Sequence, residues 1–306
     1  MTPTTMRAVL LREPGGPEHL GCEQVATPAP GPGEVLVRVH AAAITRGELE
    51  WPVDRLPAIP SYEVSGVVAA LGPGVDDVAA GDEVYGMTAF DRDGVAADYA
   101  AIPSELLAPK PRGLSHAEAA AVPLAALTAW QGLFDHGTLA PSQRVVIHGA
   151  TGGVGQFATP LAKRHGAHVI ATASADAAER ARQLGADEVV DYTVGQWATG
   201  IEPVHLVFDT AGGERLAASP RVVRSGGRLV SVAEEPPEAT GISSVYFVVE
   251  ASRDQLTEIA RLLDEGFPAP AVDSTFSLEE AKSAFERSMA ADKRGKVALT
   301  SHAEKA

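Results

Sequence analysis

Short apolar runs alternate with polar, helix-like segments through the middle of the chain. The apolar runs fit buried strands and lie at Arg144–His148, His168–Ala173, Glu188–Tyr192, His205–Thr210 and Gly227–Ala233. A helix is predicted after the first run, and another from Asp176 to Leu184, where Gly185 is a natural C-terminal stop. Strands that alternate with helices at this spacing are typical of repeated βαβ units. The pattern therefore predicts an α/β domain with a doubly wound, parallel sheet.

The preceding part of the chain has a different pattern. From about Met6 to His116 it is rich in Gly and Pro and contains short β-like runs such as Glu34–His40 and Val64–Ala70. Short runs of this kind, separated by turn residues, predict an irregular and mostly antiparallel β domain.

The segment after the parallel sheet contains an amphipathic helix, predicted from Ser277 to Ala290, and a strand, Lys296–Thr300. We expect this strand to return to the first domain. Because 306 residues are too many for one small core, we predict two domains. One is made of residues 1–116 and 251–306, and the other of residues 117–250.

Composition narrows the function classes. The formal net charge is −15, and an acidic body does not attract nucleic-acid phosphates or an anionic membrane surface. No apolar stretch is long enough to span a bilayer, and Met1–Met6 lacks the pattern of a signal peptide, so we expect a cytoplasmic protein. The single cysteine, Cys22, excludes an intramolecular disulfide and a zinc site built from several thiolates.

The most specific motif is a glycine-rich turn after the first strand of the parallel sheet. Gly149, Gly152 and Gly155 are spaced G-x-x-G-x-x-G, and Gly153 and Val154 lie inside the same turn. This spacing lets the chain turn tightly, approach a pyrophosphate with its backbone and pack the next helix against the sheet. The start of that helix offers unpaired N–H groups and the positive end of the helix dipole. We expect these residues to bind a dinucleotide; a parallel sheet without a dinucleotide is the alternative.

The end of the second strand of the sheet indicates which dinucleotide binds. NAD enzymes place an acidic side chain there, on the ribose 2′-hydroxyl, whereas this chain has Ala173 followed by Ser174. Because Ser174 can hydrogen-bond a 2′-phosphate and no carboxylate repels it, NADPH is favoured over NADH. Arg180 is the nearest cation for that phosphate, with a solvated position on the helix face as its alternative role. Asp176 remains able to reach a ribose.

Several segments spread along the chain carry a likeness to a known family. They are Met6–Val9, Pro32–Val39, Gly81–Gly86, Ala119–Trp130, the glycine turn, Leu184–Asp187, Asp191–Tyr192 and Arg294–Val297. Together they resemble the medium-chain dehydrogenase/reductases, and within them the zinc-free quinone oxidoreductases related to zeta-crystallin. The resemblance implies a GroES-like, mostly β catalytic domain and a Rossmann domain, with NADPH bound between them.

The resemblance also bears on metal binding. Zinc-dependent relatives place a ligand cysteine and a ligand histidine at positions that look like Thr45 and Tyr62 here, and no cysteine lies near Leu124, where a third ligand would come. The nine histidines are scattered without a short ligand spacing, so we expect no metal site. Without a metal, hydrogen bonds must polarise the carbonyl, which disfavours simple alcohol oxidation. Hydride delivery to a quinone or an enone needs less help than alcohol oxidation, because these acceptors are already electrophilic.

The family likeness implies further cofactor contacts. They are Thr128 near the nicotinamide ribose, Tyr192 beside the adenosine ribose, Ala211 and Gly212 after the fourth strand, Ala233 after the fifth, Phe247 beside the nicotinamide, and Lys296 closing the cleft. Phe247 has an alternative role in the sheet core or in a subunit contact. Lys296 has the alternative of a simply exposed residue at the start of a strand.

Two side chains are candidates for the chemistry, which requires an oriented acceptor and a proton for its oxygen. Tyr62 is the first candidate donor, because a phenol stays protonated at neutral pH and still donates a hydrogen bond. The alternative is that Tyr62 shapes the pocket and solvent supplies the proton. Thr45 is expected to hydrogen-bond the substrate oxygen, at a position where quinone oxidoreductases commonly have asparagine.

Two carboxylates lie near these residues in the sequence. Glu48 and Glu63 are candidates for an acid/base relay. Structural ion pairs, Arg46–Glu63 or Arg55–Glu48, are the alternative.

These observations favour an NADPH-dependent reductase of quinones or α,β-unsaturated carbonyls. Its acceptor pocket is expected to include the loops Trp51–Ile59 and Glu234–Ser244. One alternative is a zinc-free carbonyl reductase or alcohol dehydrogenase; another is a non-catalytic NADPH-sensing or RNA-binding protein, because cofactor-binding folds are reused. We also expect a homodimer, in which the edge strand containing Tyr246 pairs across a two-fold axis.

Overall fold

The computed structural model describes residues 2–51, 54–194 and 196–301. The chain forms two compact units, which we call unit 1 (Met1–Leu124 and Ala251–Ala306) and unit 2 (Ala125–Glu250). The first junction falls at residues 124/125 rather than at the expected 116/117. Residues 116–120 form a helix, α1, that packs against strands of unit 1, and this contact keeps the segment with that unit.

Unit 1 is built on a mostly antiparallel sheet, as the sequence predicts. Its strands, in spatial order, are β14 (Val272–Ser277), β15 (Lys296–Thr300), β3 (Glu34–Ile44), β4 (Glu63–Leu71), β5 (Glu83–Met87) and β7 (Leu107–Pro109). Strand β6 (Tyr99–Pro103) also pairs with β3, and β1 (Thr5–Leu11) and β2 (Leu20–Ala26) form a separate antiparallel pair. Strand β15 pairs with β3, which confirms that the C-terminal strand returns to this unit.

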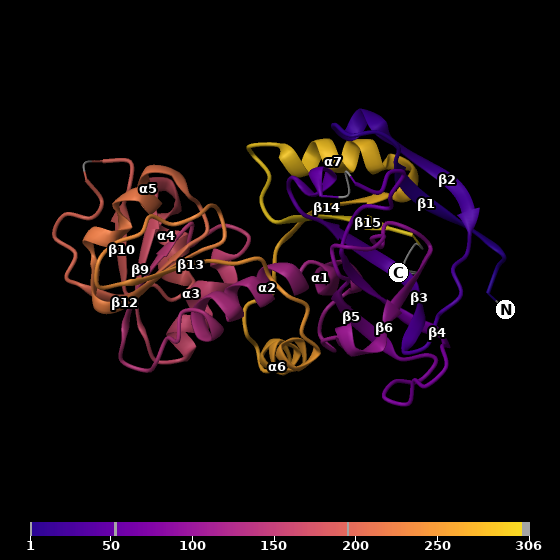
Figure 1. Ribbon diagram of the computed structural model, residues 1–306, viewed down its shortest axis with the longest axis horizontal. Helices are drawn as coiled ribbons and strands as arrows, with labels where there is room; N and C mark the ends of the chain where they lie inside the picture. Colours follow the sequence, from indigo (N-terminus) through magenta and orange to yellow (C-terminus); the bar gives the residue numbers. More distant parts are fainter. Residues whose placement is uncertain (1, 52–53, 195, 302–306) are drawn as a thin grey trace. The chain divides into compact units, whose positions relative to one another are not determined.

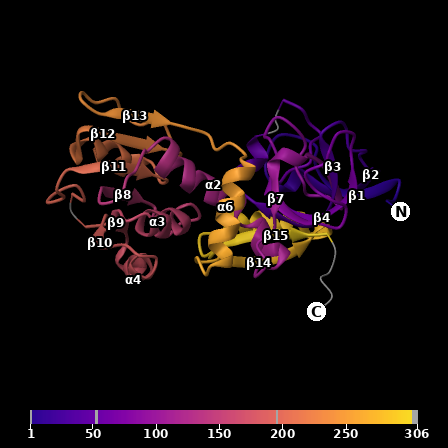
Figure 2. The ribbon, with the colours of Figure 1, turned by 90° about the horizontal axis from the view of Figure 1, so that it is seen from below.

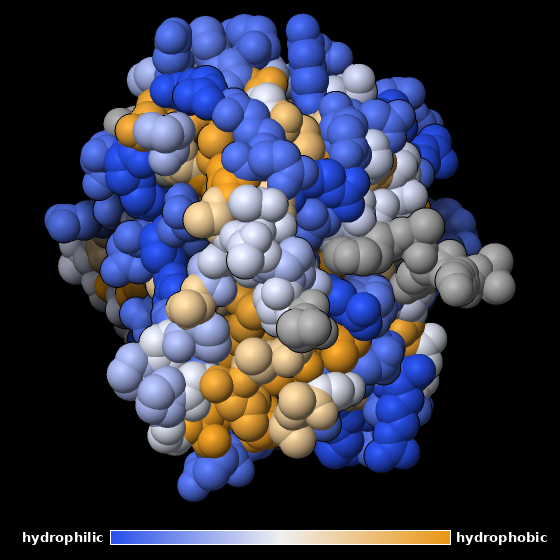
Figure 3. Space-filling view, turned by 90° about the vertical axis from the view of Figure 1, so that its right-hand side faces the viewer, coloured by the Kyte–Doolittle hydropathy of each residue, from blue (hydrophilic) through white to orange (hydrophobic). Residues whose placement is uncertain are grey.

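Three helices cover parts of this sheet: α1 (His116–Ala120), α6 (Arg253–Asp264) and α7 (Ala281–Met289). The predicted C-terminal helix is α7, preceded by a 3₁₀ turn with a capping box between Ser277 and Glu280. It contacts β14, β15 and β2 (Figure 1) and buries Ala284 and Phe285 in the apolar core of the unit. The face of unit 1 in Figure 3 is mostly hydrophilic, and its apolar residues form a larger group in the lower part of the view and a smaller one above.

Unit 2 contains a six-stranded sheet in which every neighbouring pair is parallel. The strand order is β10 (Glu188–Asp191), β9 (His168–Ala173), β8 (Arg144–His148), β11 (Val204–Asp209), β12 (Val223–Ser231) and β13 (Ser243–Tyr246). Its helices are α2 (Pro123–Trp130), which begins in unit 1, α3 (Gly155–Arg164) and α4 (Ala178–Gln183) (Figure 2), and α5 (Gly213–Ala218) (Figure 1). The order reverses beside β8, which is the doubly wound arrangement that the apolar runs predict.

The central strands β8, β9 and β11 are buried along most of their length, which explains their continuous apolar sequences. In β8, Val145, Val146 and Ile147 have no exposed surface. The helix predicted from Asp176 to Leu184 divides into a 3₁₀ turn over Ala175–Ala177 and the helix α4. Among the residues described, no helix combines the length and apolar character needed to cross a membrane.

One histidine is completely buried in unit 2, at the end of β8. His148 bonds to the Thr172 hydroxyl at 2.9 Å through Nδ1 and to the Ser219 hydroxyl at 3.0 Å through Nε2. The ring of Trp197 packs edge-on against it, with ring centroids 4.6 Å apart. Burial, together with the positive charge of Arg215, lowers the pKa of His148 to about 3. The neutral imidazole is therefore part of the folded core.

We expect unit 2 to lose stability in mild acid, because the unfolded chain binds a proton at His148 that the folded chain excludes. The unfolded pKa is near 6.5, so the loss begins there and continues as the pH falls toward 3. Between pH 6.5 and 5 it should amount to about 1.5 kcal/mol. Urea unfolding at several pH values should give a flatter profile for His148→Gln than for the wild type. Equal slopes for the two proteins would rule this origin out.

Candidate active site

Three polar residues meet where the ends of three adjacent strands of unit 1 lie side by side, because of strand register. Strand β15 pairs with β3 so that Val297 faces Ile44, and β4 pairs with β3 so that Glu63 faces Ala43. Lys296 precedes Val297, and Thr45 directly follows Ile44. The register therefore brings Lys296, Glu63 and Thr45 together, although they are far apart in the sequence.

These three side chains form a closed hydrogen-bond network, which we call the Thr45–Glu63–Lys296 cluster. Lys296 Nζ donates to Glu63 Oε2, and to Thr45 Oγ1 at 2.7 Å. Thr45 Oγ1 donates to Glu63 Oε2 at 3.0 Å, and the backbone N–H of Leu124 donates to Glu63 Oε1 at 3.0 Å. The side chains of Glu63 and Lys296 are only 1% and 10% exposed. Such a buried pair is sustained only when its remaining polar atoms are also satisfied, as they are here.

The cluster corrects two alternatives drawn from the sequence. The cation that pairs with Glu63 is Lys296, so the Arg46–Glu63 pair is wrong. Lys296 is buried, so its interpretation as a simply exposed residue is also wrong. Sequence reasoning missed the pairing because the register of β15 against β3 decides it, and the sequence pattern does not show that register.

Glu48 lies beside this cluster and is almost completely buried, with 1% exposure. Its Oε2 accepts from the Thr45 N–H at 3.0 Å, and its Oε1 accepts from the Ser61 hydroxyl at 3.2 Å. Burial raises the pKa of Glu48 to about 8, against the opposing effects of the Thr45 amide and the Lys296 charge. Ser61 was not predicted; it is buried and has a φ of +64°, a strained conformation of the kind that occurs at functional sites.

Tyr62 lies in an aromatic group rather than in the hydrogen-bond network. Its ring centroid is 5.5 Å from that of Trp51 and 5.3 Å from that of Phe90, and the residue has no exposed surface. Arg55 donates to the Tyr62 hydroxyl at 3.0 Å and to the Phe90 carbonyl, so the predicted Arg55–Glu48 pair is wrong. Burial raises the pKa of Tyr62, and Arg55 partly opposes this. In the predicted pocket loop Trp51–Ile59, residues 52 and 53 lie outside the described residues.

The glycine turn in unit 2 is closely packed. Gly149 has a φ of +70°, which favours glycine, and a Cβ on Gly155 would lie only 2.1 Å from the Gly149 carbonyl oxygen. Val154 stands at the N-cap of α3 without a side-chain cap. In the described part of the chain, the N–H groups of Gly153 and Val154 donate no hydrogen bond. The turn thus presents backbone donors at the start of a helix, which fits a pyrophosphate.

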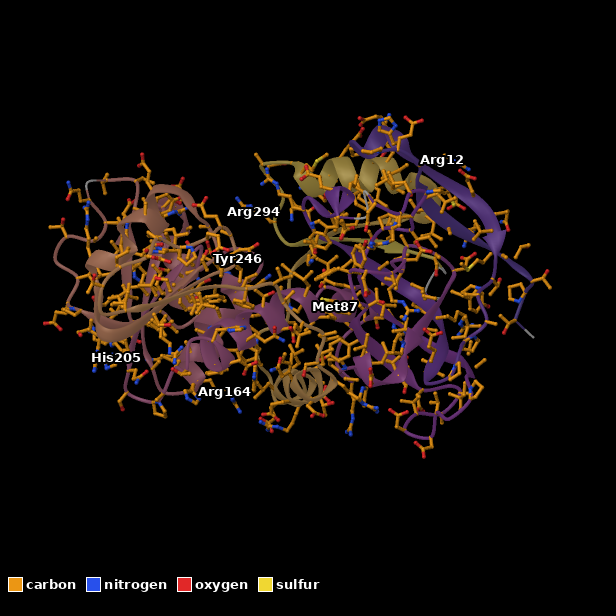
Figure 4. All side chains as sticks on the ribbon, in the orientation of Figure 1. Arg12, Met87, Arg164, His205, Tyr246 and Arg294 are labelled. Carbon is orange, nitrogen blue, oxygen red and sulfur yellow. The ribbon has the colours of Figure 1, made fainter. Side chains whose placement is uncertain are left out.

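Most predicted cofactor residues lie at one edge of the parallel sheet, because each follows the carboxyl end of a strand. The glycine turn follows β8, Ser174 follows β9, Tyr192 follows β10, Ala211 and Gly212 follow β11, Ala233 comes after β12, and Phe247 follows β13. In Figure 4, His205 at the beginning of β11 lies at the opposite edge from Tyr246 at the end of β13. Arg180, on α4, and Thr128, on α2, do not follow a strand, and Lys296 belongs to unit 1.

Two residues at this edge were not predicted. The guanidinium of Arg215 lies 4.1 Å from the centre of the Tyr192 ring, so a cation accompanies the predicted ribose contact. Asp209 is buried at the end of β11 and accepts from the N–H of Gly212 at 3.0 Å and from the Ser231 hydroxyl at 2.9 Å. It holds the loop that carries Ala211 and Gly212. A polar residue that ends an apolar strand is the sequence signal that could have identified it.

Comparisons with known proteins agree with this arrangement. The family described as "Alcohol dehydrogenase GroES-like domain" matches residues 31–112, and the family described as "Zinc-binding dehydrogenase" matches residues 184–299. The chain is 33% identical to 2-methylene-furan-3-one reductase of Solanum lycopersicum, over 97% of this chain and 79% of that protein. It is 34% identical to the chloroplastic NADPH-dependent alkenal/one oxidoreductase of Arabidopsis thaliana, over 89% of this chain and 72% of that protein.

A solved structure gives the same result for the fold. The quinone oxidoreductase of Coxiella burnetii superposes with a TM-score of 0.87 at 28% identity, over 97% of this chain and 100% of that one. The chain therefore belongs to the medium-chain dehydrogenase/reductases, in the family of quinone oxidoreductases that its sequence resembles. The GroES-like and Rossmann domains implied by that resemblance correspond to unit 1 and unit 2. Among the described residues, no group of three or more His, Cys, Asp or Glu side chains is arranged to hold a metal ion.

Ionisation of Glu48 should destabilise unit 1 as the pH rises. The folded pKa lies near 8 and the ordinary value near 4.5, so the folded chain holds a proton that the unfolded chain releases in this window. Stability should fall by about 2–3 kcal/mol between pH 6 and 8. Glu48→Gln should remove this slope in chemical unfolding at several pH values.

The matched control for this experiment is Glu50→Gln, because Glu50 is exposed in the same 3₁₀ turn. This variant should keep the wild-type slope. A Glu48→Gln protein that still loses stability with the wild-type slope would contradict the role of Glu48.

Proposed function

We propose that the protein is an NADPH-dependent reductase that transfers hydride to a quinone or to an α,β-unsaturated carbonyl compound without zinc. The observation that carries this proposal is the likeness, over 97% of this chain, to a protein named for the reduction of a conjugated ketone, 2-methylene-furan-3-one reductase. The gathering of the predicted cofactor residues at the carboxyl edge of the parallel sheet supports it.

The residues of unit 2 fit a dinucleotide. The N–H groups of Gly153 and Val154 would hold the pyrophosphate at the start of α3, and Ala211, Gly212 and Ala233 would line the same edge of the sheet. When bound, the cofactor supplies the hydride from C4 of its nicotinamide. Thr128 and Phe247 are proposed to lie beside the nicotinamide end, as the family likeness implies.

NADPH is preferred to NADH in this proposal. Ser174, rather than an acidic residue, follows β9, so a 2′-phosphate meets no negative charge at that position. Arg180 is exposed on α4 and free to reach such a phosphate, and Arg215 adds a second cation beside Tyr192. Two cations and a serine are a better match for a phosphate than for a hydroxyl.

The proposed zinc independence rests on the residues that occupy the family's ligand positions. Thr45 is bonded to Lys296 and Glu63, and Tyr62 is bonded to Arg55. A hydroxyl beside an ammonium group is a poor zinc ligand, since the two positive charges would repel each other. Thr45 is half-buried whereas Tyr62 has no exposed surface, so Thr45 is the better placed of the two to meet a substrate oxygen.

A second candidate function is a carbonyl reductase or alcohol dehydrogenase. It is favoured by the family descriptions, which name alcohol dehydrogenase and zinc-binding dehydrogenase. Such an enzyme would oxidise simple alcohols reversibly and would show no preference for conjugated acceptors.

The first experiment titrates the protein with NADPH and NADH by nicotinamide fluorescence. A quinone, a simple enone and a simple alcohol are then tested as substrates while cofactor oxidation or reduction is followed. We expect tighter binding of NADPH and turnover with the quinone or the enone. Alcohol oxidation alone would select the dehydrogenase, and binding of NADPH without turnover would select a sensor. Binding of neither cofactor would refute the proposal.

Gly155→Ala tests whether the glycine turn binds the cofactor. A methyl group at this position would meet the Gly149 carbonyl and shift the turn, while the sites in unit 1 stay unchanged. NADPH affinity should therefore fall by about tenfold or more, which corresponds to about 1.4 kcal/mol.

We also propose a homodimer in which β13 pairs with its counterpart in a second copy. β13 is an edge strand of the sheet in unit 2; Tyr246 at its end is 40% exposed, and Val248, two residues beyond it, is 60% exposed. Sedimentation at micromolar concentration should give a dimer, and Val248→Asp should shift it toward monomer. Val194→Asp, at a valine that is 67% exposed elsewhere in unit 2, should not. A wild-type monomer would reject the proposal.

A further inference from the structure

Lys296 occupies an unusual position for a lysine, since its side chain is only 10% exposed. Its ammonium group donates one hydrogen bond to Glu63 and another to Thr45. The bond to Glu63 neutralises the ammonium charge. The bond to Thr45 Oγ1, at 2.7 Å, has no such purpose, because a neutral hydroxyl adds little to an ion pair that is already made. This second bond links the ammonium group of Lys296, which can give up a proton, to the hydroxyl of the half-buried Thr45.

The Thr45 hydroxyl is the member of the cluster that can change partners without cost to Glu63. Its bond to Glu63 Oε2 is 3.0 Å long, and Oε2 also accepts from Lys296. Oε1 keeps the Leu124 N–H. If the Thr45 O–H turns to a substrate oxygen, both oxygens of Glu63 remain satisfied and the Lys296 bond to Thr45 stays in place.

We propose that Thr45 is the proton donor of the reaction and that Lys296 restores its proton, so that the two form a relay held in place by Glu63. This inference rests on the proposed reductase function and adds the source of the proton. Thr45 is the catalytic residue, because its hydroxyl touches the acceptor oxygen. Lys296 and Glu63 act through Thr45 and are positioning residues.

The relay balances the reaction. The acceptor takes a hydride with its electron pair at carbon, and the π electrons of the conjugated system move to its oxygen. That oxygen takes the proton of Thr45 Oγ1, and Thr45 takes a proton from Lys296 Nζ. The amine of Lys296 regains a proton from solvent, the reduced nicotinamide is oxidised by two electrons, and an enone leaves as an enol that converts to the saturated carbonyl.

The surroundings favour proton delivery from this point. Glu48, whose Oε2 accepts from the Thr45 amide, is kept neutral by burial, so the charges of Lys296 and Glu63 cancel within the cluster. No net negative charge then opposes the growth of negative charge on an acceptor oxygen near Thr45.

The test compares Thr45→Val with Thr45→Ser, because neither variant disturbs the Lys296–Glu63 pair. Valine has the size of threonine but no proton to donate, whereas serine keeps the hydroxyl. We expect Thr45→Val to lower kcat by about 100-fold and Thr45→Ser to keep most of it. The dissociation constant for NADPH, from fluorescence, should be unchanged in both variants.

A second set of variants tests Lys296. Lys296→Met leaves Glu63 charged and unpaired, so we expect this change alone to destabilise the protein. The double variant Glu63→Gln/Lys296→Met removes both charges and should fold, with kcat as low as that of Thr45→Val. Lys293→Met is the matched control, because Lys293 lies three residues before Lys296, in the turn that leads into β15, and its ammonium group donates to the Gly295 carbonyl rather than to the cluster. It should keep the wild-type kcat.

The outcomes separate the relay from a structural role. A wild-type kcat in the double variant Glu63→Gln/Lys296→Met would show that Lys296 only balances the charge of Glu63. That result would overturn the place of Lys296 in the relay. An unchanged kcat in Thr45→Val would overturn the relay as a whole, and a loss in Tyr62→Phe instead would name Tyr62 as the donor. If wild-type protein neither binds NADPH nor reduces a quinone or an enone, the proposed function itself fails, which is a distinct result.

Discussion

The buried ion pair between Lys296 and Glu63 is the interaction on which the arrangement of unit 1 depends. It joins residues 233 positions apart and ties the strand that follows unit 2 to the strands that precede it. Neither charge is tolerable in the interior without the other. The pair also fixes the Thr45 hydroxyl and the Leu124 backbone, so the chain enters α2 from a defined point. A single electrostatic contact thus connects the closure of the sheet with the positions of the candidate catalytic groups.

In unit 2 the polar residues are positioned by the geometry of the parallel sheet and not by a buried ion pair. Its strands are apolar and parallel, so their carboxyl ends meet at one edge and the loops there hold the polar residues. The backbone of the glycine turn, the Asp209 carboxylate and the Arg215 guanidinium are all placed by this simple geometry. The charged groups named here lie at the carboxyl edge of the sheet. In unit 1, by contrast, charge lies inside the protein and is neutralised in pairs.

This difference explains what could be predicted from the sequence. The parallel sheet and its glycine turn could be predicted, because local spacing decides them, whereas most of the candidate cofactor residues after the other strands came from the family likeness. The Lys296–Glu63 pair could not be predicted, because the whole of unit 2 separates the two residues in the sequence. The antiparallel register between β15 and β3 brings them together. The same limit applies to Arg55, which was expected to pair with Glu48 and instead meets Tyr62. The likeness to a family identified Thr45 and Tyr62 by position but did not show which neighbours hold them.

The place of β15 in the chain has a consequence for how the protein is made. This strand lies between β14 and β3 in the sheet, yet a ribosome reaches it only after the whole of unit 2 has been synthesised. Unit 2 is continuous in sequence, so it has all its strands at a time when residues 41–44 of β3 still lack their partner strand. An open, apolar strand edge is a site for pairing with other chains. The nascent protein is therefore most exposed to misassembly in the interval before Lys296 emerges, and the ion pair that closes the sheet also ends that interval.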